Sequence, residues 1–105
     1  MRNKQFIKDI KHELEEEFGD LIYRVTLFGS RVARSAHNDS DYDVLIVLRK
    51  IIGWRAKDKI FDAIALLNIK YDCIIDAHIV AEPELLMLKG KQPYIQAALK
   101  TGVTA

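Results

Sequence analysis

A continuously apolar pentapeptide with two acidic residues at its threshold constrains this chain more than any other feature. Val44–Leu48 contains only Val, Leu and Ile, and such a run is typical of a strand that is buried on both faces. Asp41 and Asp43 stand directly before it, and residues two apart in a strand point to the same side. Two carboxylates held together repel each other unless a cation lies between them, and hard oxygen ligands suit Mg²⁺. The segment therefore predicts a buried strand that begins at a divalent-cation site.

A Gly-Ser pair stands upstream, at the end of another apolar run. Gly29 allows a ligand to approach the backbone closely. Ser30 is expected to begin a short helix, roughly 30–35, whose N-terminus favours phosphate. Arg31 and Arg34 can each bind phosphate as a bidentate fork or pair with a surface acid, and the sequence favours neither role. A phosphate cradle opposite a two-carboxylate metal site describes a centre for nucleotidyl transfer.

These residues resemble the motif of the DNA polymerase β-like nucleotidyltransferase superfamily, which reads Gly-Ser, a spacer and then Asp-x-Asp. The spacer here, 31–40, fits the family's length. The short chain is similar in particular to the minimal nucleotidyltransferases, many of which are encoded beside a HEPN-domain partner as toxin–antitoxin pairs. It departs at Ser35, where the family often has glycine. The resemblance implies an α/β fold, a small mixed sheet with helices packed on it like a polymerase β palm, as one domain over 1–105.

The resemblance also implies roles for individual residues. Asp41 and Asp43 would bridge two Mg²⁺ ions, while Asp76 would bind the ion nearest the nucleophile and help to take its proton. The residues implied to bind the nucleotide are Gly29, Ser30 and Arg31. The implied reaction moves a nucleoside monophosphate, AMP from ATP, onto a hydroxyl. By analogy with the toxin–antitoxin members, that hydroxyl belongs to a tyrosine of a HEPN-type toxin.

Asp76 can also be interpreted without the resemblance. It stands within the predicted strand 73–80, where an ionised carboxylate is expected to be buried, and therefore paired or bound to metal. The alternative is a buried Asp with a purely structural role, whose carboxylate pairs with an arginine or accepts hydrogen bonds from backbone amides. Asp72 is the competing carboxylate, but its place before the strand predicts an exposed turn. His78 shares the side of Asp76 and is expected to be a core residue or to support the site indirectly.

Composition restricts the class of protein. A chain of 105 residues with 50% apolar and 30% charged residues is typical of an ordinary globular domain. The formal net charge of +1 indicates no general attraction to nucleic acid. The single cysteine, Cys73, excludes an internal disulfide and fits a reducing compartment. No apolar run approaches the roughly 20 residues that span a bilayer, so a cytoplasmic protein is expected.

Hydrophobic periodicity predicts the remaining elements. Helices are expected over 4–18, 54–67, from Glu82 to Gly90, and over 93–100, and strands over 21–28, 44–48 and 73–80. The 54–67 helix is expected to pack Ile60, Phe61, Ile64 and Leu67 on the sheet. The closing segment, 85–99, carries more apolar side chains than a thin sheet can cover, which predicts an interface and a homo- or hetero-oligomer.

Two other functions remain open. The first is a non-catalytic module that neutralises its partner by contact alone. The second is a nucleotidyltransferase that modifies a small molecule, as antibiotic-adenylylating enzymes do, with a second chain supplying the substrate-binding domain. Nothing in the sequence identifies the acceptor or a base-recognition pocket.

Overall fold

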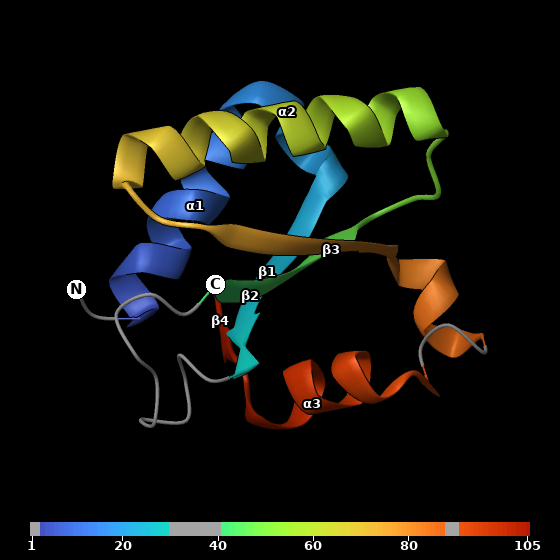
Figure 1. Ribbon diagram of the computed structural model, residues 1–105. Helices are drawn as coiled ribbons and strands as arrows, with labels where there is room; N and C mark the ends of the chain where they lie inside the picture. The colour runs from blue at the N-terminus through green and yellow to red at the C-terminus, as the bar shows by residue number, and fades with distance from the viewer. Residues whose placement is uncertain (1–2, 30–40, 88–90) are drawn as a thin grey trace.

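The computed structural model describes residues 3–29, 41–87 and 91–105 and has helices on both sides of one sheet (Figure 1). The helices are α1 (Asn3–Phe18), α2 (Trp54–Tyr71) and α3 (Pro93–Thr101), with short 3-10 helices η1 (Gly19–Leu21) and η3 (Glu82–Leu86). The strands are β1 (Ile22–Phe28), β2 (Tyr42–Leu48), β3 (Ile75–Ala81) and β4 (Val103–Thr104). None of the helices in these ranges is long and apolar enough to cross a membrane.

The sheet is mixed and has the strand order β3-β2-β1-β4. β1 is antiparallel to β2 and to β4, whereas β2 and β3 are parallel and are joined through α2. A parallel pair needs such a crossover, because the chain must return to the same end of the sheet before the next strand begins. The expected α/β class with a small mixed sheet is confirmed.

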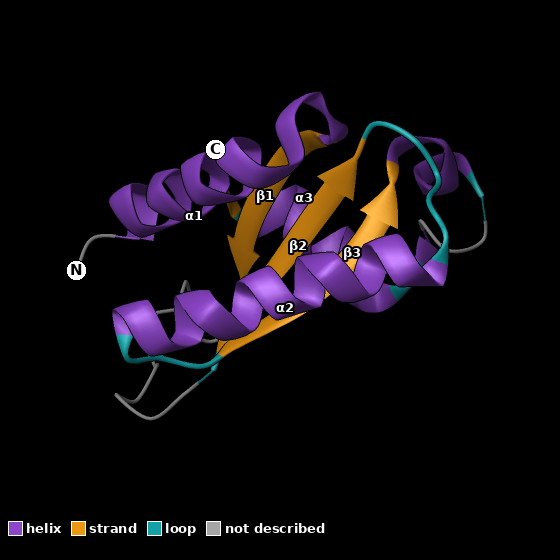
Figure 2. Ribbon diagram, turned by 90° about the horizontal axis from the view of Figure 1, so that it is seen from above, coloured by secondary structure: helices purple, strands orange, loops and turns teal. Residues whose placement is uncertain are grey.

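The two faces of the sheet carry different helices. α1 and α2 lie together over one face, and α3 lies under the other (Figure 2). β2 contributes to both sides, since Val44, Ile46 and Leu48 pack in the cluster under α1 and α2, while Leu45 and Val47 pack in the cluster with α3. The prediction that this strand is buried on both faces is therefore confirmed.

Several element boundaries and one packing prediction differ from the sequence-based expectations. α2 continues to Tyr71 and ends where Asp72 adopts a left-handed conformation (φ 50°), so β3 begins at Ile75 rather than Cys73. Phe61 was expected to pack on the sheet but is exposed, because it lies at the flank of the buried stripe that Ile60, Ile64 and Leu67 form on α2. The helix expected from Glu82 to Gly90 is a 3-10 helix that ends at Leu86. Residues 88–90 of that expected helix, and the whole of the helix expected over 30–35, lie outside the described ranges.

The sequence patterns did not predict β4. Its two residues pair with β1, where the hydroxyls of Thr26 and Thr104 are hydrogen-bonded at 2.8 Å. The amide of Ala105 donates to the carbonyl of Val25 at 2.9 Å. Gly102 makes this return possible, because a Cβ at its position would overlap the Thr26 side chain. A two-residue strand has too little alternation to be seen in a sequence.

Candidate active site

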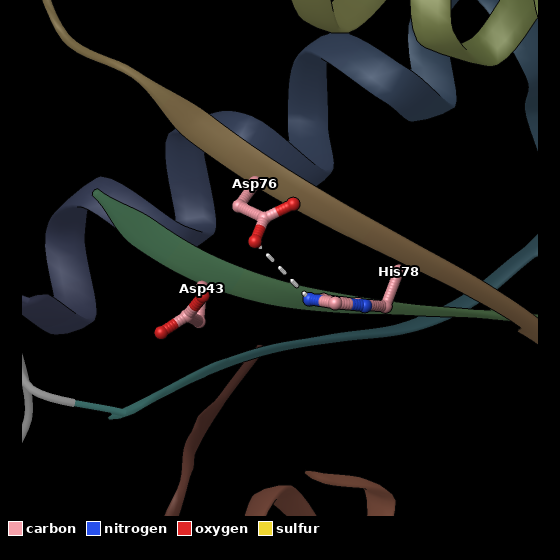
Figure 3. Close-up of side chains that lie close together, drawn as sticks. All are labelled: Asp43, Asp76 and His78. Atoms are coloured by element: carbon pink, nitrogen blue, oxygen red, sulfur yellow. Dashed lines mark ion pairs between the residues drawn. The ribbon is translucent and has the colours of Figure 1, made fainter.

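The parallel ladder between β2 and β3 aligns two aspartates. Asp43 is the register partner of Asp76, so their side chains leave neighbouring strands at the same level of the sheet. His78 follows Asp76 by two residues and therefore shares its side. Figure 3 shows the three side chains together, one from β2 and two from β3. Each offers a ligand atom, and these atoms all lie within 4.8 Å of one another.

The surroundings of Asp43 change the pKa of its carboxyl group. Burial raises the pKa of the Asp43 carboxyl above its ordinary value, and the negative charges of Asp76 and Asp41 and a hydrogen bond with Asp76 raise it further. The His78 imidazole has the opposite effect on this pKa. Two carboxyl groups that disfavour each other's ionisation are relieved by a shared proton or a bound cation. The site therefore favours positive charge.

Gly29 lies directly against this cluster. It follows Phe28, the register partner of Asp43, and has a φ of +83°. A Cβ built on Gly29 would overlap the Asp43 carboxylate. Glycine is thus required twice, by the backbone conformation and by the close approach of Asp43. The sequence predicted a close approach at Gly29, but to a ligand rather than to an aspartate of the chain itself.

The expected burial of Asp76 is wrong, although its side of the strand was predicted correctly. Its side chain is 54% exposed. β3 is an edge strand of the sheet, and its first residues lie beyond the part of this face that packs against α3. Val80, further along the same side of β3, is fully buried in the α3 cluster. Asp76 therefore lies at an open, accessible part of the sheet.

The other predicted site residues are placed as follows. Asp41 precedes β2, is exposed and is not among the converging groups, yet it is near enough to raise the pKa of Asp43. The pairing of β2 with β3 fixes the position of Asp43, whereas Asp41 lies before the paired residues. Asp72 is exposed at the end of α2, as expected. Ser30 and Arg31, predicted to bind the nucleotide, lie outside the described residues, as does Arg34.

His78 is the residue that sequence reasoning undervalued. Its Nε2 lies 3.6 Å from Asp76 Oδ2, and its ring lies 5.7 Å from that of Phe28 at an interplanar angle of 50°. The side chain is 30% exposed, so it has one flank on the core and another at the open site. Strand alternation did place His78 beside Asp76, but the register with Asp43 was needed to show that all three converge.

The donor set fits a divalent cation. Carboxylate oxygens suit Mg²⁺ and Mn²⁺, and a half-buried imidazole extends the set toward transition metals. The strand register supports this fit, because it brings the Asp43 carboxylate to Asp76 although the two negative charges repel. Asp43 and Asp76 are therefore suited to hold such an ion.

Comparisons with known proteins identify a family for this chain. The model of the nucleotidyltransferase domain family matches residues 7–94. A protein of Methanocaldococcus jannaschii, provisionally named a protein adenylyltransferase, is 32% identical over 71 residues, which cover 68% of this chain and 72% of that protein.

Two solved structures share the fold. One is a toxin–antitoxin crystal structure with AMP-PNP, with a TM-score of 0.61 and 19% identity over 96% of this chain and 70% of that chain. The other is a mutant of the toxin–antitoxin MntA-HpeT, with a TM-score of 0.61 and 16% identity over 92% of this chain and 69% of that chain. With the family match over most of its length, this chain belongs to the nucleotidyltransferase domain family.

Proposed function

We propose that this nucleotidyltransferase transfers AMP from ATP to a hydroxyl of a partner protein, and that the partner is a HEPN-type toxin. The observation that carries the proposal is the apposition of Asp43 and Asp76 on an open part of the sheet. The choice of AMP and of a protein acceptor is supported by the relative named as a protein adenylyltransferase. The choice of a toxin is supported by the toxin–antitoxin structures that share the fold, one of which holds AMP-PNP.

Asp43 and Asp76, joined by Asp41, are the residues that would hold Mg²⁺, two ions by the family resemblance. When bound, Mg²⁺ would neutralise triphosphate charge and make the acceptor hydroxyl easier to deprotonate. The carboxylates would fix the reacting groups relative to β2 and β3, which are rigid elements of the core. Positioning of this kind accounts for much of the acceleration of phosphoryl transfer.

The chain's residues would act on both reactants, the acceptor hydroxyl and the triphosphate of ATP. The acceptor oxygen forms a bond to the α-phosphorus of ATP, the bond from that phosphorus to the departing oxygen breaks, and pyrophosphate leaves. Asp76, the accessible carboxylate, would accept the proton of the acceptor hydroxyl. By the family resemblance, Gly29, Ser30 and Arg31 would hold the triphosphate, with backbone amides and the arginine as donors to phosphate.

We expect the partner to dock on the closing segment. Leu86 is 92% exposed, and Met87 and Leu99 are also exposed, whereas Ile95 is buried. Exposed large apolar side chains favour an interface. The prediction that the closing segment is only partly covered is thus confirmed for these residues, and the identity of the partner remains part of the proposal.

The two alternatives predict different chemistry. A non-catalytic binder gains nothing from a pair of carboxylates that repel each other, although the exposure of Asp76 makes that pair less costly than a buried one. A small-molecule nucleotidyltransferase would require a second chain for the acceptor. Both alternatives predict that the partner protein never gains an adenylyl group.

The test is to co-express the chain with its neighbouring gene product, purify the complex, and add ATP and Mg²⁺. Intact mass spectrometry of the partner should show the added mass of one or more adenylyl groups, with pyrophosphate released in equal amount. The Asp43→Asn variant should form the complex without any mass gain, and Asp72→Asn should match the parent. Stable complex formation with no mass gain under any nucleoside triphosphate would favour the non-catalytic module.

A further inference from the structure

His78 is the one member of the convergent cluster that the proposed chemistry has not used. Its Nε2 is 3.6 Å from Asp76 Oδ2, and it offers a ligand atom within 4.8 Å of those of both aspartates. Two ligands of one ion, each about 2.1 Å from it, are separated by at most about 4.2 Å. The 3.6 Å between His78 and Asp76 is within that limit, and the whole cluster exceeds it by at most a few tenths of an ångström.

The surroundings of His78 direct its ring toward the aspartates. Strand alternation fixes the side of β3 from which it leaves, and the Phe28 ring, 5.7 Å away, supports one flank of the imidazole. The partly exposed remainder faces the open site beside Asp76. These two constraints keep the imidazole beside the Asp76 carboxylate.

We infer that His78 supplies a nitrogen ligand to the cation held by Asp43 and Asp76, and that this nitrogen shifts the site's preference from Mg²⁺ toward transition metals such as Mn²⁺ and Co²⁺. Imidazole binds first-row transition metals well, whereas Mg²⁺ prefers oxygen ligands and keeps its water. The inference rests on the proposed function only in taking Asp43 and Asp76 as a cation site.

The direct test is pulsed electron paramagnetic resonance of the full-length protein with Mn²⁺, which detects nitrogen bound to the metal. The spectrum should show a directly bound imidazole nitrogen, and this signal should disappear in His78→Gln. A matched variant, His12→Gln, should keep the signal. His12 pairs with Glu16 on α1, apart from the cluster.

Affinity gives a second and independent measurement. An all-oxygen site also binds Mn²⁺ and Co²⁺ more tightly than Mg²⁺, so the informative quantity is the change caused by His78→Gln. Calorimetric titration should show Co²⁺ binding weakened about 10–100-fold, and Mg²⁺ binding weakened less than about threefold. Equal losses for both ions would overturn the inference, because His78 would then only position Asp76.

Two further controls distinguish failure of the His78 inference from failure of the proposed function. Labelling histidine with heavy nitrogen in the parent protein should alter the Mn²⁺ spectrum, which tests the ligand without relying on a variant that could misfold. A parent protein that binds Mn²⁺ without any bound nitrogen, while still transferring AMP, would overturn the role of His78 alone. A parent that binds no divalent cation, with or without ATP, would overturn both this inference and the proposed function.

Discussion

The two faces of the sheet differ in how completely they are covered. The face under α1 and α2 contains a large continuous apolar cluster, with Ile7, Ile10 and Leu14 of α1 fully buried. The opposite face packs a smaller cluster against the nine-residue α3, and the part of it beyond α3 carries Asp43, Asp76 and His78. One face holds the fold together, and the other leaves the side chains of Asp76 and His78 accessible. Polar groups can converge only where the sheet is not needed for packing.

The largest expected effect is on the open face and concerns catalysis. Asp43→Asn and Asp76→Asn should each lower adenylyl transfer by about a thousandfold or more, because a metal ligand is lost. Without metal, the free energy of unfolding should stay the same or rise, since the Asp43–Asp76 repulsion is removed. Asp72→Asn, a change at the exposed end of α2, should leave transfer intact. Activity measured by pyrophosphate release and stability measured by urea unfolding separate the two effects.

If Asp72→Asn abolished transfer while Asp76→Asn did not, the pairing of Asp43 with Asp76 would not be the functional one. The assignment of the proposed active site to the open face would then have to be revised.

The next effect is on stability and compares the two clusters directly. Ile10→Ala, under α1, should reduce the free energy of unfolding by about 3–5 kcal/mol, because the surrounding cluster is closed and cannot collapse into the cavity. Ile95→Ala, on α3, should lose about 2–3 kcal/mol, since the smaller cluster can relax. Both residues are fully buried isoleucines, so the chemistry of the deletion is matched. Equal losses in urea unfolding would contradict the proposed difference between the faces.

A smaller effect is expected at Gly29, where one substitution should change both the stability of the fold and the binding of Mg²⁺. Gly29→Ala should lose about 1–2 kcal/mol through the strained backbone at positive φ and should also weaken Mg²⁺ binding, because the new methyl group displaces Asp43. Gly19→Ala is the matched control: its φ is +59°, but a Cβ there meets nothing within 4 Å. It should lose similar stability and keep the parent's Mg²⁺ affinity. Unchanged Mg²⁺ binding in Gly29→Ala would show that Asp43 does not need the contact.

The smallest expected effect is the dependence on pH. Because the pKa of Asp43 is raised, mainly by burial and then by Asp76, the metal-free protein loses stability as pH rises through that pKa, and Mg²⁺ restores it. Below that pKa a proton competes with the ion, so Mg²⁺ affinity should fall by up to about tenfold per pH unit. Thermal melts with and without Mg²⁺ across the acidic range measure both trends. In Asp43→Asn this Asp43-linked dependence should vanish.

The sequence alone determined much of the architecture. The uniformly apolar 44–48 run predicted a strand buried on both faces, and alternation along β3 correctly separated Asp76 and His78 from Ile75 and Ile79. The Gly-Ser and Asp-x-Asp motif indicated the family. These features are local: strand period, backbone freedom and spacing are properties of consecutive residues.

Only the tertiary structure decided how the site is composed. The parallel register opposed Asp43 to Asp76, left Asp41 outside the convergent group and added His78. Asp76 was expected to be buried because its neighbours are apolar, but exposure depends on which helix covers a given part of the sheet, and α3 stops short of it. Register and coverage arise from contacts between segments far apart in the chain, and no local pattern encodes them.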